Sequence, residues 1–217
     1  SFPDVAPTLL DIAGIPIHPQ MTGTSFKAQL IAAESGRIDA NRDHALLGKE
    51  RHDIGRTDGD RLSVSYPSRA IRTDDYLYVH NFKPNRWPGC DPQYGLLNCD
   101  SSPTKTYLEA ILKSDPEYRF YEMSFGKRPQ EELFHIASDP DCINNLANHP
   151  ELQQTKTRLW TLLKRELTSQ KDPRILGDGD IFDFYPNCRI ERQQDLYRKP
   201  DYNPVEIFNS KYGADKK

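Results

Sequence analysis

The feature that most constrains the fold of this chain is a leucine stripe between residues 152 and 167. The leucines recur at the spacing of one side of an α-helix, and the stripe is formed by Leu152, Leu159, Leu162, Leu163 and Leu167. Pro150 stands at the start of the segment, where a proline fits the first helical turn. Because a helix with a single apolar side must bury it against another layer, the sequence predicts a long helix packed on a sheet.

Several β-rich runs supply strands for that sheet. Residues 68–72 and 76–82 are joined across the polar turn 73–75 and predict a hairpin. Residues 131–136 predict another strand, and residues 44–47 predict a shorter one. The fold class that we predict is therefore α/β, with a small antiparallel sheet packed on a long C-terminal helix.

Shorter elements are expected at the start and in the middle of the chain. Asp4 can cap a short helix that ends at Gly14. A second short helix is expected over residues 24–34, and a modest one over residues 107–113. Residues 48–63 read as a polar loop between two strands.

Length and charge limit the classes of partner. At 217 residues the chain is long enough for one domain, or for one large and one small lobe. Its net charge of −3 argues against nucleic acid as a partner, except through a local basic patch. No apolar run reaches membrane-spanning length, so we expect no membrane partner. The chain begins at Ser1 on the lead-in to a helix, and we expect it to be part of a longer protein.

Four cysteines leave the redox state open. Cys90, Cys99, Cys142 and Cys188 are spaced too irregularly for a structural zinc site. Cys90 and Cys99 bracket a loop in which a disulfide would remove roughly 3 kcal/mol of chain entropy from the unfolded state. Cys142 and Cys188 either form a second bridge or remain thiols. Oxidised pairs would indicate an extracytoplasmic compartment.

A dense block of charge follows the predicted strand at residues 44–47. Residues 48–56 are almost all charged residues, glycine or histidine, a composition that a packed core cannot use. Because sites in α/β proteins gather where strands end, this block is a candidate binding surface. The alternative is a solvated turn whose surface ion pairs each contribute under about 1 kcal/mol.

Several segments resemble the C-terminal part of sulfatases of the alkaline-phosphatase-like superfamily. Two of them are residues 4–14 with 21–26, and residues 132–140 with 145–147. A middle block is most similar to the heparan N-sulfatases (N-sulfoglucosamine sulfohydrolases), and it comprises residues 48–56, 65–70 and 78–82. The resemblance extends from about residue 2 to about residue 186.

This resemblance implies an α/β sulfatase fold of which the chain carries the C-terminal portion. Residues 1–60 would end the large α/β domain, residues 61–186 would form a smaller lobe, and residues 187–217 an extended tail. The implied activity is hydrolysis of N-sulfate (sulfamate) groups of glucosamine in heparan-type glycosaminoglycans. The implied partners are a sulfated saccharide substrate and the missing N-terminal sulfatase domain. The implied location is extracytoplasmic, in a bacterial periplasm or secreted, rather than lysosomal.

The resemblance also implies cofactors. Sulfatases use a formylglycine nucleophile and a calcium ion, and in the family their residues lie mainly upstream of this segment. We therefore expect both to be supplied by residues outside this chain. Residues 65–69 fit the formylglycine motif in form, but the chain continues into a strand, so we interpret them as a structural turn. Asp178, Asp180 and Asp183 lack the spacing of a calcium-binding EF-hand, and we expect no metal site there.

For the charged block, the resemblance implies recognition of a sulfated glucosamine. Lys49, Arg51 and Arg56 would bind sulfate oxygens, the arginines through paired hydrogen bonds. Glu50 would accept hydrogen bonds from sugar hydroxyls. His52 is the candidate catalytic residue, which would donate to the bridging nitrogen or to a neighbouring oxygen.

Polar side chains in the predicted strands have simpler interpretations. Arg69 and Arg72 are an odd number of positions apart, so they point to different faces of their strand. We expect each of them to be a solvent-facing charge. His80 and His135 are expected to be packed or hydrogen-bonded within the sheet.

Two further functions stay open. One is an O-sulfatase that acts on a sulfated sugar. The other is a non-catalytic carbohydrate-binding module, for which Arg86, Trp87 and Tyr94 would offer aromatic rings beside a cation. Trp87 could equally anchor a loop.

Overall fold

A computed structural model describes residues 1–59 and 61–184 of the chain. The chain divides into two compact units, which are described separately. Of the described residues, the first unit comprises 1–48, 69–80 and 131–175, and the second comprises 49–59, 61–68, 81–130 and 176–184. Because the chain passes between the units several times, each unit is assembled from segments that are distant in sequence. The predicted division at residue 60 concerns the longer protein and stays a prediction.

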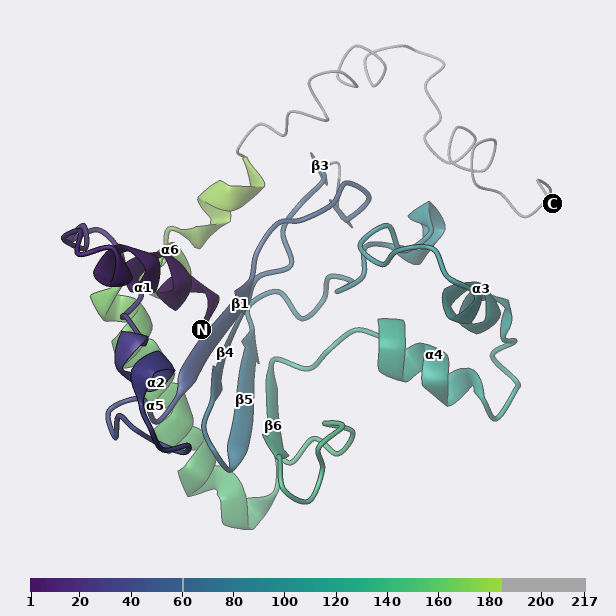
Figure 1. Cartoon of the computed structure of the whole chain (residues 1–217). Helices are drawn as coiled ribbons and strands as arrows, with labels where there is room; N and C mark the ends of the chain where they lie inside the picture. Colours follow the sequence, from purple (N-terminus) through teal and green to yellow (C-terminus); the bar gives the residue numbers. More distant parts are fainter. Residues whose placement is uncertain (60, 185–217) are drawn as a thin grey trace. The chain divides into compact units, whose positions relative to one another are not determined.

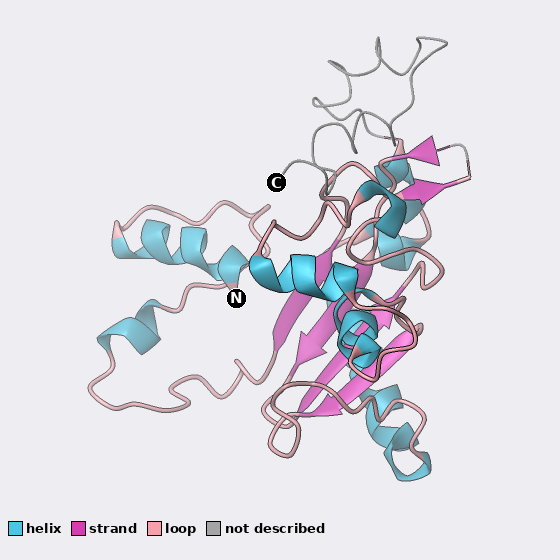
Figure 2. Ribbon diagram, turned by 90° about the vertical axis from the view of Figure 1, so that its right-hand side faces the viewer, coloured by secondary structure: helices cyan, strands magenta, loops and turns pink. Residues whose placement is uncertain are grey.

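The first unit is built on a four-stranded sheet with the order β1-β4-β5-β6. The strands are β1 (Ala45–Lys49), β4 (Ser68–Arg72), β5 (Tyr76–Asn81) and β6 (Glu131–His135), and they lie side by side in Figure 2. Strands β5 and β6 are antiparallel, with Tyr76 opposite His135 and His80 opposite Glu131. The predicted β4–β5 hairpin is confirmed, and Thr73 N–H donates to Tyr76 O across its turn (2.9 Å).

The long helix α5 (Gln153–Ser169) packs against this sheet (Figure 1). It follows the 3-10 turn η3 (Pro150–Leu152), so the position of Pro150 at the start of the helical segment is confirmed. Leu159, Leu163 and Leu167 are buried against apolar side chains of the strands, which include Ile71, Tyr78 and Leu133. The outer leucines of the stripe, Leu152 and Leu162, pack partly buried against the same core. The predicted sheet packed on a long helix, an α/β arrangement, is therefore confirmed.

Arg69 corrects the expectation of a solvent-facing strand charge. Its side chain is only 10% exposed, and its Nε lies 2.7 Å from Asp172 Oδ2, with Nη2 3.3 Å from Asp172 Oδ1. Asp172 follows α5, so this ion pair ties the end of the helix to β4. Because Arg69 points to the helix-covered face, the aliphatic part of its side chain is buried and its charge needs a partner. Arg72 is half-buried, and its Nη1 donates to Asp74 O (3.0 Å).

Both strand histidines are packed, as predicted. The ring of His80 stacks on Trp160 of α5, with ring centroids 4.4 Å apart. Burial lowers the pKa of His80, although the nearby Glu131 carboxylate acts in the opposite direction. His135 packs edge-on against Tyr76 and forms a hydrogen bond with the Ser138 hydroxyl (2.8 Å).

The N-terminal part of the first unit contains two short helices, α1 (Val5–Ile12) and α2 (Lys27–Ile31), which confirm the predicted pair. The predicted cap by the Asp4 side chain is wrong. The carboxylate of Asp4 instead accepts from Thr24 N–H (2.8 Å) and from Arg42 Nη1 (3.1 Å). Asp4 therefore ties the start of α1 to the segments around Thr24 and Arg42.

The second unit holds the predicted polar loop, which contains a small hairpin. Strands β2 (Thr57–Asp58) and β3 (Arg61–Leu62) are antiparallel. The other elements are η2 (Pro92–Tyr94), α3 (Pro103–Ala110), α4 (Tyr118–Phe125) and η4 (Gly179–Asp183). Helix α6 (Pro173–Leu176) belongs to the first unit except for its last residue. Helix α3 begins earlier than expected because the Ser102 hydroxyl caps it, accepting from Lys105 N–H (3.1 Å). Helix α4 was not predicted.

The sequence left the redox state of the cysteines open. In this structure Cys90, Cys99 and Cys142 are free thiols, so the structure contains no Cys90–Cys99 bridge. Cys90 is buried in the second unit, whereas the Cys99 sulfur is directed to Asp100 O (3.8 Å). Cys188, and with it the possible bridge to Cys142, lies outside the described residues. Among the described residues, no helix combines the length and the apolar character that crossing a bilayer needs.

Candidate functional site

The charged block forms a loop of the second unit, here called the His52 loop (residues 49–56). Its C-terminal end is fixed by Arg56, whose side chain is fully buried. Arg56 Nε donates to Trp87 O (2.6 Å), Nη2 to Pro88 O (2.9 Å) and Nη1 to Val64 O (3.2 Å). A guanidinium that satisfies several backbone carbonyls holds segments together that have no regular secondary structure.

Arg56 is therefore a correction to the predicted sulfate-binding set. Its burial and its contacts with backbone carbonyls leave it inside the loop scaffold rather than on the surface that a saccharide could reach. Burial lowers the pKa of Arg56, although neighbouring acidic groups such as Asp91 oppose that effect. The sequence indicated that Arg56 is charged, but it did not indicate that its side chain is buried.

Lys49 anchors the other end of the loop. Its ammonium donates to Pro88 O (2.8 Å) and lies 5.9 Å from the centre of the Tyr66 ring. Burial and, secondarily, the positive charge of Arg56 lower the pKa of Lys49. Since Lys49 and Arg56 share Pro88 O, the two ends of the His52 loop are held on one carbonyl.

The middle of the loop is more exposed. His52 is exposed, and its Nδ1 lies 2.7 Å from Asn98 Nδ2. Arg51 is half-buried, and its Nη1 donates to Phe182 O (3.0 Å) in η4. Glu50 is half-buried, and its backbone carbonyl accepts from Tyr66 N–H (3.1 Å). The loop thus brings a histidine, a carboxylate and two cations within one short segment of the second unit.

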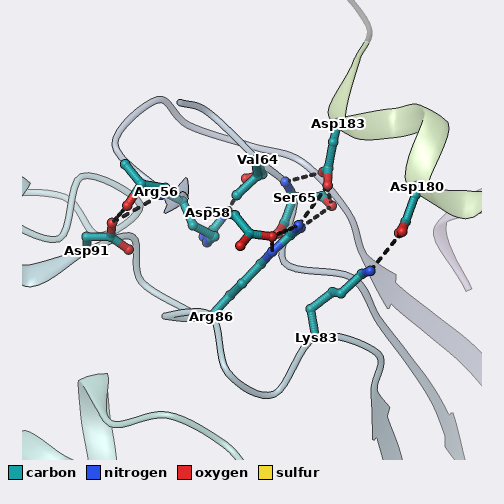
Figure 3. A network of polar contacts seen from close by, with 10 residues as sticks. Arg56, Asp58, Val64, Ser65, Lys83, Arg86, Asp91, Asp180 and Asp183 are labelled. Atoms are coloured by element: carbon teal, nitrogen blue, oxygen red, sulfur yellow. Dashed lines mark hydrogen bonds and ion pairs between the residues drawn. The ribbon is translucent and has the colours of Figure 1, made fainter. Parts of the chain in front are cut away.

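A second polar network lies around Arg86, as Figure 3 shows. Its Nη2 lies 2.6 Å from Asp58 Oδ2 and 2.9 Å from Asp183 Oδ2, and its Nη1 donates to Ser65 O (2.9 Å). The Asp183 carboxylate also accepts from the Ser65 N–H (2.7 Å) and from the Ser65 hydroxyl. Lys83 pairs with Asp180 at 2.9 Å nearby.

This network shows the contacts of two groups of residues that the sequence analysis singled out. Arg86 is buried, so it stabilises the loops and is not a cation offered to a sugar. In the Asp-rich segment near residues 178–183, Asp180 forms an ion pair with Lys83 and Asp183 forms one with Arg86. Residues 1–59 and 61–184 contain no group of three or more His, Cys, Asp or Glu side chains that could hold a metal ion.

Ser65 has the surroundings of a structural residue. It is completely buried, and its hydroxyl is bound to Asp183. This environment agrees with the interpretation of residues 65–69 as a turn rather than as a nucleophile motif.

Asn98 is a residue of the site that the sequence did not indicate. Its Oδ1 accepts from Arg56 Nη2 (3.3 Å), while its Nδ2 faces His52. Asn98 lies in the irregular segment between Cys90 and Cys99, where no periodicity or motif singles out one polar residue. Only the folding of this segment against the His52 loop brings the two together.

No protein-family model matches the chain. Among curated proteins, it is 30% identical over 183 residues to an ulvan-active sulfatase of Formosa agariphila; the match covers 83% of this chain and 27% of that protein. This chain is related in sequence to sulfatases. A second ulvan-active sulfatase of the same organism is 26% identical over 185 residues, which cover 83% of this chain and 30% of that protein. The chain thus spans less than a third of the length of the curated sulfatases it matches.

Solved structures with a similar backbone trace have a lower sequence identity to this chain than these curated relatives. One is a protein in complex with its substrate D-glucosamine-2-N,6-O-disulfate, at 19% identity and a TM-score of 0.46, covering 79% of this chain and 25% of that chain. Another is a 2-O GAG sulfatase, at 20% identity and a TM-score of 0.44, covering 78% of this chain and 25% of that chain.

Proposed function

We propose that this chain is the C-terminal, substrate-recognition portion of a sulfatase of the alkaline-phosphatase-like superfamily. The observation that carries this proposal is the exposed His52 on a loop that two cationic anchors, Lys49 and Arg56, hold at both ends. The sequence similarity to curated sulfatases over most of the chain supports it. The substrate class that we propose is a glucosamine carrying an N-sulfate group in a heparan-type glycosaminoglycan, since the middle block resembles the heparan N-sulfatases.

In this proposal each member of the His52 loop has a distinct role. Arg51 and Lys49 supply positive charge for the sulfate oxygens. Glu50 accepts from hydroxyl groups of the sugar, which orients the ring. His52 donates a hydrogen bond to the bridging nitrogen, or to a neighbouring sulfate oxygen, where negative charge develops as the bond to sulfur breaks. Arg56 holds the loop in position without touching the substrate.

The nucleophile and the metal belong to a different part of the protein in this proposal. Formylglycine supplies the attacking oxygen and calcium supplies charge stabilisation when they are bound, and residues outside this chain would provide both. We propose an extracytoplasmic location, periplasmic or secreted, because a sulfated polysaccharide is found outside the cytoplasm.

The partner of this chain would be the N-terminal domain of the same protein. Helices α1 and α2 and their flanking segments expose large apolar side chains, namely Phe2, Leu9, Ile12, Ile15, Leu30 and Ile31. Large exposed apolar side chains on neighbouring helices are what we expect of an interface that another part of the protein covers. The small fraction of the curated relatives that the chain spans supports the same interpretation.

The decisive experiment is His52→Ala in the whole protein that carries this chain. We expect kcat on N-sulfoglucosamine to fall by roughly 100-fold or more, because a donor aimed at developing charge is lost. The unfolding temperature should stay nearly unchanged, since His52 is exposed. His18→Ala, at another exposed histidine, is the matched control and should keep wild-type kinetics. Wild-type turnover in His52→Ala would contradict the assignment.

The substrate class needs its own comparison. Hydrolysis of N-sulfoglucosamine and of 6-O-sulfoglucosamine should be measured side by side with the same preparation. Cleavage of only the O-sulfated sugar would replace the N-sulfatase proposal with the O-sulfatase alternative.

A non-catalytic carbohydrate-binding function has one observation in its favour. A hollow of about 480 Å³ in the second unit is lined by Trp87, Asn85, Gln93 and Lys127, among others. The ammonium of Lys127 lies 5.2 Å from the centre of the Trp87 ring, so an aromatic face and a cation occur together. Saturable, salt-sensitive heparin binding that Trp87→Ala abolishes, without any hydrolysis by the whole protein, would favour this function.

A further inference from the structure

A chain of hydrogen bonds connects three residues of the second unit, Arg56, Asn98 and His52. Arg56 Nη2 lies 3.3 Å from Asn98 Oδ1, and Asn98 Nδ2 lies 2.7 Å from His52 Nδ1. Asn98 is also held through its backbone, because its N–H donates to Gly89 O (3.2 Å). The side-chain amide is therefore placed between a buried cation and the exposed histidine.

The orientation of the Asn98 amide follows from the chemistry of Arg56. A guanidinium has only N–H donors and stays protonated, so the atom that faces it must be an acceptor. Placing the amide nitrogen there would set two donors against each other. Asn98 Oδ1 thus faces Arg56, and its NH2 group is directed to His52.

This orientation determines which nitrogen of His52 carries the proton. Because Asn98 Nδ2 can only donate, His52 Nδ1 must be the acceptor of the 2.7 Å hydrogen bond. In the neutral imidazole the proton then lies on Nε2, the nitrogen on the other side of the ring. A second proton, on Nδ1, would face the amide donor and break the bond.

We propose that Asn98 is a positioning residue that selects the Nε2-protonated tautomer of the neutral His52 ring. His52 then acts on the sulfated group as a hydrogen-bond donor through Nε2–H, and does not transfer a proton to the leaving nitrogen. A neutral imidazole holds its remaining proton too strongly to act as an acid near neutral pH. The proposal rests on the proposed function for the use of His52, but the position of the proton can be measured without any substrate.

The test is Asn98→Asp in the whole protein. An aspartate has the same shape, and one of its oxygens still accepts from Arg56. The other oxygen replaces the NH2 donor that faces His52 by an acceptor. We expect this variant to have a proton on His52 Nδ1. The hydrogen bond from Arg56 to residue 98 is kept.

The readout is the long-range ¹H–¹⁵N correlation spectrum of protein labelled with [¹⁵N]histidine, in which a protonated ring nitrogen is distinguished from an unprotonated one. The His52 signals are identified by their loss in His52→Gln. We expect wild type to show protonated Nε2 and unprotonated Nδ1, and Asn98→Asp to show protonated Nδ1. Asn85→Asp, the same chemical change at an exposed residue, is the control and should match wild type.

Two spectral outcomes would overturn the proposal: protonated Nδ1 in the neutral ring of wild type, or an unchanged ring in Asn98→Asp. Should Asn98→Asp fail to fold, Asn98→Ala takes its place, and there the ring should show a mixture of both tautomers.

Kinetic measurements distinguish this inference from the proposed sulfatase function. The expected spectra without sulfatase activity would leave Asn98 as a positioning residue and contradict the proposed function. We expect kcat to fall roughly 10-fold or more in Asn98→Asp, with a smaller change in KM.

Discussion

The Asp183 carboxylate lies 2.9 Å from the Arg86 guanidinium, and the two side chains are 1% and 6% exposed. Asp183 belongs to η4, whereas Arg86 follows β5, so the ion pair joins two segments far apart in sequence. Both members of the pair also bind Ser65, three residues before β4 begins. The pair therefore holds together loops that have little regular secondary structure of their own.

Replacing Asp183 by Asn should strongly destabilise the protein. Removing one partner of a buried ion pair leaves the other charge without compensation, and we expect a loss of about 3 kcal/mol in the free energy of unfolding. Asp180→Asn is the matched control, because its ion pair with Lys83 is 60% exposed on the aspartate side and should contribute less than about 1 kcal/mol. Urea-induced unfolding measures both variants, and equal effects would contradict the role given to Asp183.

The contribution of Asp183 should depend on pH. Burial acts to raise its pKa, but the hydrogen bonds from Ser65 and the ion pair with Arg86 outweigh burial, so the pKa lies below the usual value of 3.8. A carboxyl whose pKa is lower in the folded state stabilises the fold above its unfolded-state pKa. That stabilisation is lost as the pH falls through the folded-state pKa.

We therefore expect the difference in unfolding free energy between wild type and Asp183→Asn to be largest above about pH 5. It should shrink as the pH falls below about 4. Urea titrations across this range provide the measurement, with Asp180→Asn as the reference for general acid effects. A difference that grows on acidification would have the wrong sign.

Local sequence patterns explain which parts of the fold were predictable. The leucine stripe of α5 follows the helical period, and β4, β5 and β6 are runs of β-forming residues; the structure contains all four elements. Helix α4 was missed because it is short and rich in aromatic residues, which favour strands. The predicted capping of α1 by Asp4 failed for another reason: its side chain accepts from Thr24 N–H, which is distant in sequence, and not from the first turn of α1.

The candidate site was predictable only as a segment. The composition of residues 48–56 indicated a functional loop, but not that Arg56 would be buried within it. The buried Arg56 side chain donates to the carbonyl groups of residues 87 and 88, which approach it only after the chain has folded back. The pairing of Arg86 with Asp183 spans an even longer stretch of sequence, and no local pattern encodes it.

Truncating Leu159 should destabilise the first unit more than truncating Leu162. Leu159 is fully buried in the core between α5 and the sheet, whereas Leu162 lies at the margin of that core. Leu159→Ala should cost about 3 kcal/mol, which combines lost burial with the cavity left behind. Leu162→Ala, the same change on the same helix, should cost about 1 kcal/mol because the site is partly solvated. Similar losses in the two variants would contradict the packing of α5.

Cys90 and Cys99 should react with thiol reagents at very different rates. Cys90 is fully buried, and burial raises the pKa of its thiol, although the nearby Arg56 acts in the opposite direction. A buried thiol with a raised pKa has little thiolate and little access to the reagent, whereas Cys99 is partly exposed. Native alkylation with iodoacetamide, followed by peptide mass spectrometry, should label Cys99 at least about 10-fold faster than Cys90. A Cys90–Cys99 disulfide would instead protect both residues equally until a reductant is added, so parallel samples with and without reductant distinguish free thiols from a bridge.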